Sequence, residues 1–261
     1  MNLTFINPGF EHSIDSILLF QKDDTTPYWM DALFYFYPEV SKEELKSRSM
    51  KERKNYLMEV LRPTWIDLKA ELDSKILLYN LHWQKHLPQI QDALSDAFET
   101  DISLILNDLH ADISLNPVCP RFLEEHYFDV FYKNSERGAL GVSIHEIIHY
   151  IWFHVWNGHF HDCYEEYDTP SLKWILSEMV VESIMSDGRL STINPYYPRE
   201  HGGCVYRYFQ DMIINERCVL DTIDKFYRSN SIVDFMEESY QYCLKYEDEI
   251  REHIAQTEKE F

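Results

Sequence analysis

The segment Gly141–Phe153 carries two histidines and a glutamate at spacings that suit a metal ion. His145 and His149 lie four residues apart, and Glu146 follows the first histidine directly. In a helix, positions i and i+4 share one face, so both imidazoles can point at the same ion. Glu146 would lie about 100° around the helix, where it can reach a water molecule without displacing a histidine. This H-E-x-x-H pattern is typical of zinc proteases, in which the glutamate is the general base.

The same five residues also fit a purely structural helix. The isoleucines between and beside the histidines would bury its remaining faces, so the histidines would lie inside the protein with or without a metal. Chance produces the pattern in roughly one sequence in twenty of this composition, so it needs independent support. A catalytic zinc ion needs a third protein ligand and an open fourth position.

A third histidine does not complete the site. The extended pattern H-E-x-x-H-x-x-G-x-x-H requires glycine at position 152 and histidine at 155, where this chain has Trp152 and Val155. His154 is one position away and would point about 100° from the required direction. His159 and His161 could be ligands only if the chain folds back, and a surface turn is the expected alternative.

A glutamate on a second helix is the other option. Helical spacing is expected over residues 170–187, with Asp168 or Thr169 as the cap and Gly188 at the end. Glu178 lies 29 residues after His149, and Glu182 lies one turn further on the same face. Carboxylates buried among the apolar residues of this helix need a cation or a hydrogen-bond donor.

The segments "HEIIH" and "WILSEMVVE" together resemble the gluzincin metallopeptidases, which include the thermolysin-like and aminopeptidase families. The resemblance covers residues 145–187. It implies one Zn²⁺ per chain, bound by His145, His149 and Glu178, with Glu146 as the general base. It also implies that the Glu182 carboxylate orients one of the zinc-binding histidines by accepting its imidazole N–H.

The resemblance further implies a tyrosine or histidine that stabilises the oxyanion. The segment "NPYYPREHGGCVYRYF" offers candidates, of which His201 and Tyr206 are the catalytic ones that we name. An aromatic loop that packs on the core is the alternative. The resemblance also implies an edge strand that pairs with an extended substrate, for which "HYFDVFYK" (residues 126–133) is the candidate. The other tyrosines that could serve as oxyanion donors are Tyr196, Tyr197 and Tyr208.

The rest of the chain must supply the elements that position these residues. Few glycines and many Leu, Ile, Glu and Lys predict mainly helices, first over residues 11–98. In that region the capping box Ser41–Glu44 would begin a helix that ends near Leu61, and Pro63 would interrupt it before helical spacing resumes. Further helices are expected at about 205–215 and 232–258. Strands are expected within residues 101–108, 111–118 and 126–133, with Asp108 and His110 in a turn between strands.

These elements predict an α+β, mainly helical fold. A helical N-terminal region, residues 1–100, would precede a zincin-like metallopeptidase core, residues 101–261. That core would hold a small mixed sheet, the active-site helix, the glutamate helix and the C-terminal helices in one compact unit.

Composition restricts the partners and the compartment. The formal net charge of −21 would repel phosphate backbones and anionic lipid, so we expect neither nucleic acid nor membrane as a partner. Five cysteines without a C-x-x-C pair suggest reduced thiols. The N-terminus does not resemble a signal peptide, and no stretch is long and apolar enough for a membrane span. We therefore expect a cytoplasmic protein.

The sequence favours a zinc-dependent metallopeptidase that hydrolyses a peptide or protein substrate, with Glu146 as general base. The main alternative is a non-catalytic, peptidase-like zinc-binding or regulatory interaction protein. Retention of Glu146 favours catalysis, because a purely structural zinc site needs no base. A helical interaction protein without metal is the third alternative.

Overall fold

The computed structural model describes residues 1–162, 167–194 and 199–260, which form two compact units. The sheet unit comprises residues 2–84 and 108–140 together with the C-terminal residues from Glu258 on. The helical unit comprises Met1, residues 85–107 and the described part of residues 141–257. Helices α5 (Arg62–Ala97) and α6 (Glu136–Phe160) each contribute residues to both units.

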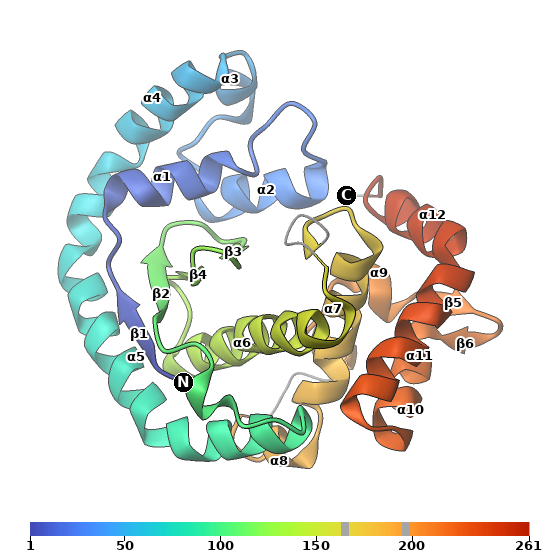
Figure 1. The fold of residues 1–261 in the computed structure, drawn as a ribbon. Helices are drawn as coiled ribbons and strands as arrows, with labels where there is room; N and C mark the ends of the chain where they lie inside the picture. Colours follow the sequence, from blue (N-terminus) through green and yellow to red (C-terminus); the bar gives the residue numbers. More distant parts are fainter. Residues whose placement is uncertain (163–166, 195–198, 261) are drawn as a thin grey trace. The chain divides into compact units, whose positions relative to one another are not determined.

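A small mixed sheet forms the centre of the sheet unit (Figure 1). Its strands follow the order β1-β2-β4-β3, in which β1, β2 and β4 are parallel and β3 is antiparallel to β4. Apolar and polar residues alternate along β2. The apolar ones share one face and are buried: Leu109, Ala111 and Ile113. The bounds are β1 Leu3–Ile6, β2 Leu109–Ser114, β3 Arg121–Phe122 and β4 Tyr127–Phe131.

The strand predictions are right for two segments and wrong for others. β4 confirms the strand within residues 126–133, and β2 begins two residues before the predicted segment 111–118. Residues 102–104 form a short 3₁₀ helix instead of a strand. The N-terminal strand β1 was not predicted, because its four residues are too few for a clear alternation.

The prediction that "HYFDVFYK" is an edge strand is wrong. β4 lies between β2 and β3, and β3 pairs with it through Arg121 and Phe122. The alternating aromatic pattern identified a strand, but the pattern contains no information on which neighbours would pair with it.

The N-terminal half of the chain is helical as predicted, with different breaks. The expected helix over residues 42–61 is two helices, because Ser49 and Glu52 form a second capping box that begins a new one. The predicted break near Pro63 is present: α4 ends at Val60 and α5 begins at Arg62, so Pro63 lies in the first turn of α5, where its missing N–H costs no hydrogen bond. The bounds are α1 Phe10–Leu18, α2 Pro27–Phe36, α3 Lys42–Lys46 and α4 Met50–Val60.

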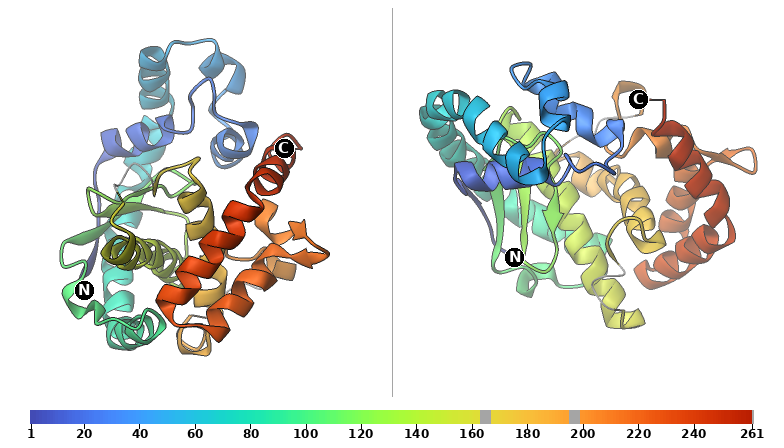
Figure 2. Two further views of the ribbon diagram at one scale, coloured as in Figure 1. Left: turned by 45° about the vertical axis from the view of Figure 1, so that its right-hand side comes forward. Right: turned by 90° about the horizontal axis from the view of Figure 1, so that it is seen from above.

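The helical unit is built around α7, which is buried along almost its whole length and lies beside the C-terminal helices in both views of Figure 2. It packs against α10 and α11, and α9 packs against α10 and α12. The bounds are α7 Leu172–Met185, α8 Gly188–Ser191, α9 Arg207–Gln210, α10 Val219–Ser229, α11 Ile232–Lys245 and α12 Glu247–Thr257, with the hairpin strands β5 Ile213–Ile214 and β6 Arg217–Cys218.

Several predicted boundaries in this unit are wrong. Ser171, not Asp168 or Thr169, caps α7, since its hydroxyl accepts the Trp174 N–H at 3.0 Å. Gly188 begins α8 instead of ending α7. The expected helix at 205–215 is α9 followed by β5, and the one at 232–258 is divided into α11 and α12.

At the level of fold class, the structure confirms a mainly helical α+β protein with a small mixed sheet. In the described part of the chain, no helix is long and apolar enough to cross a membrane.

Candidate metal centre

Helices α6 and α7 bring two histidines and one glutamate together in the helical unit. His149 Nε2 lies 3.5 Å from Glu178 Oε2, and His145 Nε2 lies 3.7 Å from the same oxygen. The two imidazole rings, one turn apart on α6, have centroids 5.0 Å apart. One donor atom from each of the three residues lies within 4.8 Å of the other two. The three ligands predicted from sequence therefore converge.

These separations fit a tetrahedral metal ion. Nitrogen and oxygen donors that lie about 2.1 Å from such an ion are about 3.4 Å from one another. The two nitrogen-to-oxygen distances given above exceed that value by only a few tenths of an ångström. Two imidazoles and one carboxylate are also a donor set that Zn²⁺ accepts in catalytic sites. The residues present therefore fit a zinc ion.

The surroundings of this group are apolar. His149 and Glu178 are completely buried, and nearly all of α7 around Glu178 is buried as well. An ionised carboxylate in such a place costs several kcal/mol unless a positive group compensates it. A cation held between Glu178 and the two histidines would supply that compensation.

Glu146 lies at the border of the same group. It is 7% exposed, and its Oε1 lies 4.0 Å from His145 Nε2. This places the carboxylate near the donor atoms, about 100° around α6 from His145 and about 60° from His149. The position suits a group that contacts a water molecule beside the ion.

Glu182 contacts an arginine. Its Oε1 accepts hydrogen bonds from Arg199 Nε at 2.8 Å and from Nη2 at 2.5 Å. The other oxygen, Oε2, is buried and has no hydrogen-bond partner among the described residues. That Glu182 orients a zinc-binding histidine stays a prediction.

Sequence reasoning did not find Arg199. Its Nη1 also donates to Asp221 Oδ1 at 2.8 Å, so one guanidinium joins α7 to α10. Burial lowers the pKa of Arg199, but its hydrogen bonds to Glu182 and Asp221 outweigh burial and raise the pKa overall. Burial also raises the pKa of the Cys204 thiol to about 12, and the Glu182 charge adds to this effect. The arginine is therefore a fixed cation beside Glu182.

The two candidate oxyanion donors lie near this face of α7. Tyr206 stacks on Trp174, with ring centroids 6.1 Å apart, and Trp174 lies one turn before Glu178. His201 is exposed and follows Arg199 by two residues, so their backbones are at most about 7 Å apart. Tyr208 is buried. The alternative candidates Tyr196 and Tyr197 lie outside the described residues.

The other histidines in α6 and just after it do not belong to this group. His154, His159 and His161 are exposed, and none belongs to a possible metal-binding group in the part of the chain that the structure describes. The helix continues to Phe160, so His159 lies in its last turn and not in the expected surface turn.

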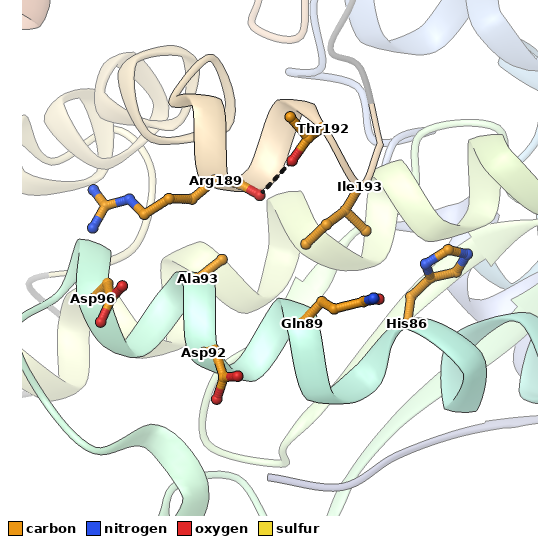
Figure 3. A pocket seen from close by; sticks show the side chains of 8 residues that line it. All are labelled: His86, Gln89, Asp92, Ala93, Asp96, Arg189, Thr192 and Ile193. Atoms are coloured by element: carbon orange, nitrogen blue, oxygen red, sulfur yellow. Dashed lines mark hydrogen bonds between the residues drawn. The ribbon is translucent and has the colours of Figure 1, made fainter.

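A separate hollow of about 480 Å³ lies between the last turns of α5 and the segment Arg189–Ile193 (Figure 3). Asp92, Asp96 and His86 line it on the α5 side, and Thr192 donates to the Arg189 carbonyl at its rim. Neither His145, His149 nor Glu178 lines this hollow, so it is not the mouth of the candidate metal centre.

No protein-family model matches the chain, and no curated protein or solved structure matches it at a significant level. The function must therefore be argued from the side chains themselves.

Proposed function

We propose that this protein is a zinc-dependent metallopeptidase of the gluzincin kind, which binds one Zn²⁺ at His145, His149 and Glu178. The observation that carries the proposal is the convergence of three donor atoms within 4.8 Å, two of them from completely buried residues. The substrate is a peptide or protein, and the cytoplasmic location expected from the sequence is part of the same proposal.

Bound zinc supplies a Lewis acid that acidifies water and polarises a carbonyl group. Glu146 performs the proton transfers: its carboxylate accepts a proton from water and later delivers that proton to the leaving amine. Its low exposure keeps the carboxylate largely away from bulk solvent. His145 and His149 stay neutral, because a lone pair on each Nε2 is needed for binding.

Arg199 and Glu182 hold the ligand helix in place. Glu182 lies one turn after Glu178, and Arg199 fixes it to Asp221 on α10. His201 and Tyr206 are the donors that we propose for the substrate oxyanion: Tyr206 stacks on Trp174, one turn before Glu178, and His201 follows the Glu182 partner Arg199 by two residues.

Metal analysis of the full chain, purified without added zinc, tests the binding site. Wild type is expected to contain zinc, and Glu178→Gln and His149→Ala are each expected to lose one equivalent per chain. His154→Ala is the matched control, because it removes an exposed histidine from the same helix. Equal zinc content in all four proteins would contradict the ligand assignment.

Cleavage of a peptide library tests the reaction. Glu146→Gln preserves the shape of the side chain but removes its basicity, so we expect zinc content to stay the same and cleavage to fall at least 100-fold. Cleavage at the wild-type rate in this variant would exclude the proposed base. Zinc-loaded wild type that cleaves no peptide would exclude hydrolysis and leave the non-catalytic alternative.

A further inference from the structure

A second group of buried polar residues lies in the sheet unit. His110, Asp112 and Ser114 alternate along β2 with the apolar residues of its other face. Such alternation normally places the polar row in solvent. Here Asp112 and Ser114 are buried, and α1 packs against β2. His110 belongs to this strand, so the expectation that it lies in a turn is wrong.

The strand register places two acidic residues directly opposite each other. Asp112 on β2 and Asp129 on β4 are Cα partners in the parallel pairing, so both side chains leave the same face of the sheet. Asp112 is 3% exposed, and Asp129 is completely buried. Like charges directly across a sheet repel, and burial removes the water that would screen them. The pair needs a positive charge.

Helix α1 supplies two polar partners for this pair of aspartates. His12 Nε2 lies 3.0 Å from Asp129 Oδ1 and 3.3 Å from Asp112 Oδ2. Ser16, one helical turn later, donates its hydroxyl to Asp129 Oδ2 at 2.5 Å. Both oxygens of Asp129 therefore have partners.

Asp112 still lacks a compensating partner for one of its oxygens. Its Oδ1 is buried and has no hydrogen-bond partner among the described residues, and the His110 Nε2 nearest to it lies 3.6 Å away. A protonated His12 would leave one net negative charge on the group.

The donor geometry resembles that of the first centre. One donor atom each from His12, Asp112 and Asp129 lies within 4.8 Å of the other two. The two nitrogen-to-oxygen distances, 3.0 and 3.3 Å, are close to the separation of about 3.4 Å expected around a tetrahedral ion. The His12 side chain is 24% exposed, which gives an ion access from solvent.

We propose that His12, Asp112 and Asp129 bind a second divalent transition-metal ion, of the Mn²⁺ or Zn²⁺ type. Two carboxylates neutralise its charge, and the imidazole favours a transition metal over Mg²⁺ or Ca²⁺. The ion takes the place of the proton on His12 and gives the unpartnered oxygen of Asp112 a positive neighbour. This site is independent of the proposed peptidase function, since none of its residues belongs to the first centre.

Titration with Mn²⁺ alone tests the proposal in a chain whose first centre is disabled by His145→Ala and Glu178→Gln. After removal of metal with a chelator, the electron paramagnetic resonance signal of free Mn²⁺ is followed as it is added to the full chain. We expect one ion bound per chain, and at least a tenfold weaker affinity after Asp112→Asn or Asp129→Asn is added. Zinc analysis of the same proteins is expected to show the same order, with more bound metal in the parent than in either aspartate variant.

Asp15→Asn is the matched control, because Asp15 lies on α1 but its side chain is 53% exposed and pairs with Lys54. It should bind Mn²⁺ as the parent does. If either aspartate variant fails to fold, His12→Gln carries the test, since His12 is partly exposed. A parent chain that binds neither Mn²⁺ nor Zn²⁺ would show that the two aspartates share a proton instead and would overturn the proposal. Unchanged affinity in Asp112→Asn or His12→Gln would also overturn it.

Discussion

At the scale of single residues, this protein compensates its buried carboxylates in different ways. Glu182 has the Arg199 guanidinium, and Asp129 has a histidine and a serine hydroxyl. Glu178 faces two imidazole nitrogens, and Asp112 has one oxygen without a hydrogen-bond partner among the described residues. Side chains of the protein compensate Glu182 and Asp129. A bound cation would add most stabilisation at Glu178 and Asp112.

The Glu182–Arg199 pair predicts a specific pattern of stability. Arg199→Met would leave Glu182 buried without its cation, and we expect unfolding free energy to fall by about 2 kcal/mol, less than for a fully buried pair because the arginine is partly exposed. The double variant Glu182→Gln/Arg199→Met should recover at least half of this loss, because no charge is then left unpaired. Urea unfolding of the single and double variants measures the coupling.

Arg228→Met provides the control, because Arg228 pairs with Asp224 on the surface of α10 and should change stability by less than about 0.5 kcal/mol. If the effects of Glu182→Gln and Arg199→Met on the free energy of unfolding simply add in the double variant, the pair contributes no coupling energy.

At the scale of elements, the sequence predicts best those helices and strands whose formation depends on local residue spacing alone. The helix that carries His145 and His149 and the helix that carries Glu178 were both predicted, because each has continuous helical spacing over more than three turns. The convergence of His145, His149 and Glu178 followed from the ligand pattern. The position of Arg199 did not, because its contact with Glu182 depends on how a short 3₁₀ segment returns to α7.

Other elements depend on long-range pairing that local pattern does not show. β1 is a strand because it pairs with β2, more than a hundred residues later. Alternation such as that in β2 normally places the polar row in solvent, whereas here α1 covers that row and makes His12 a neighbour of Asp112 and Asp129. The second candidate metal site was therefore not predicted, although its residues lie in a helix and in strands that were predicted at least in part.

The short helix α8 yields a prediction on pH. Asp187 caps it by accepting the Arg189 N–H at 2.9 Å, and it also accepts from the Arg189 guanidinium and from the Tyr227 hydroxyl. The guanidinium is the main reason that the pKa of Asp187 falls from 3.8 to about 2. Because the folded pKa is below the unfolded one, this carboxylate stabilises the fold above pH 3.8, and the contribution disappears as the pH falls toward 2.

The shift corresponds to about 2 kcal/mol near neutral pH. We expect Asp187→Asn to be less stable than wild type by about this amount at pH 6–7, with a difference that shrinks as the pH is lowered toward 3. Urea unfolding at several pH values measures it. The control Asp211→Asn removes an exposed carboxylate that lies 3.7 Å from Arg207 and should have little effect. A difference that does not change with pH would exclude the charge of Asp187 as the cause.

At the scale of the whole molecule, each compact unit contains, within the described part of the chain, one group of histidine and buried acidic side chains that could hold an ion. The group in the helical unit joins α6 to α7, and the group in the sheet unit joins α1 to β2 and β4. In both, the ligands come from separate elements, so a bound ion would cross-link two or more of them. Metal binding should then protect these elements against local opening.

Hydrogen exchange after metal removal tests this expectation for both groups at once. A ligand at 1,000 times its dissociation constant stabilises the state that binds it by about 4 kcal/mol, so chelation should speed exchange 100-fold or more where opening of the site limits exchange. In wild type we expect faster exchange in peptides from α6 and α7 and in those from α1, β2 and β4. In His145→Ala/Glu178→Gln, chelation should affect only the second set, and in Asp112→Asn only the first. A chelator response that persists in the α1, β2 and β4 peptides of Asp112→Asn would show that their protection comes from something other than an ion bound to that carboxylate.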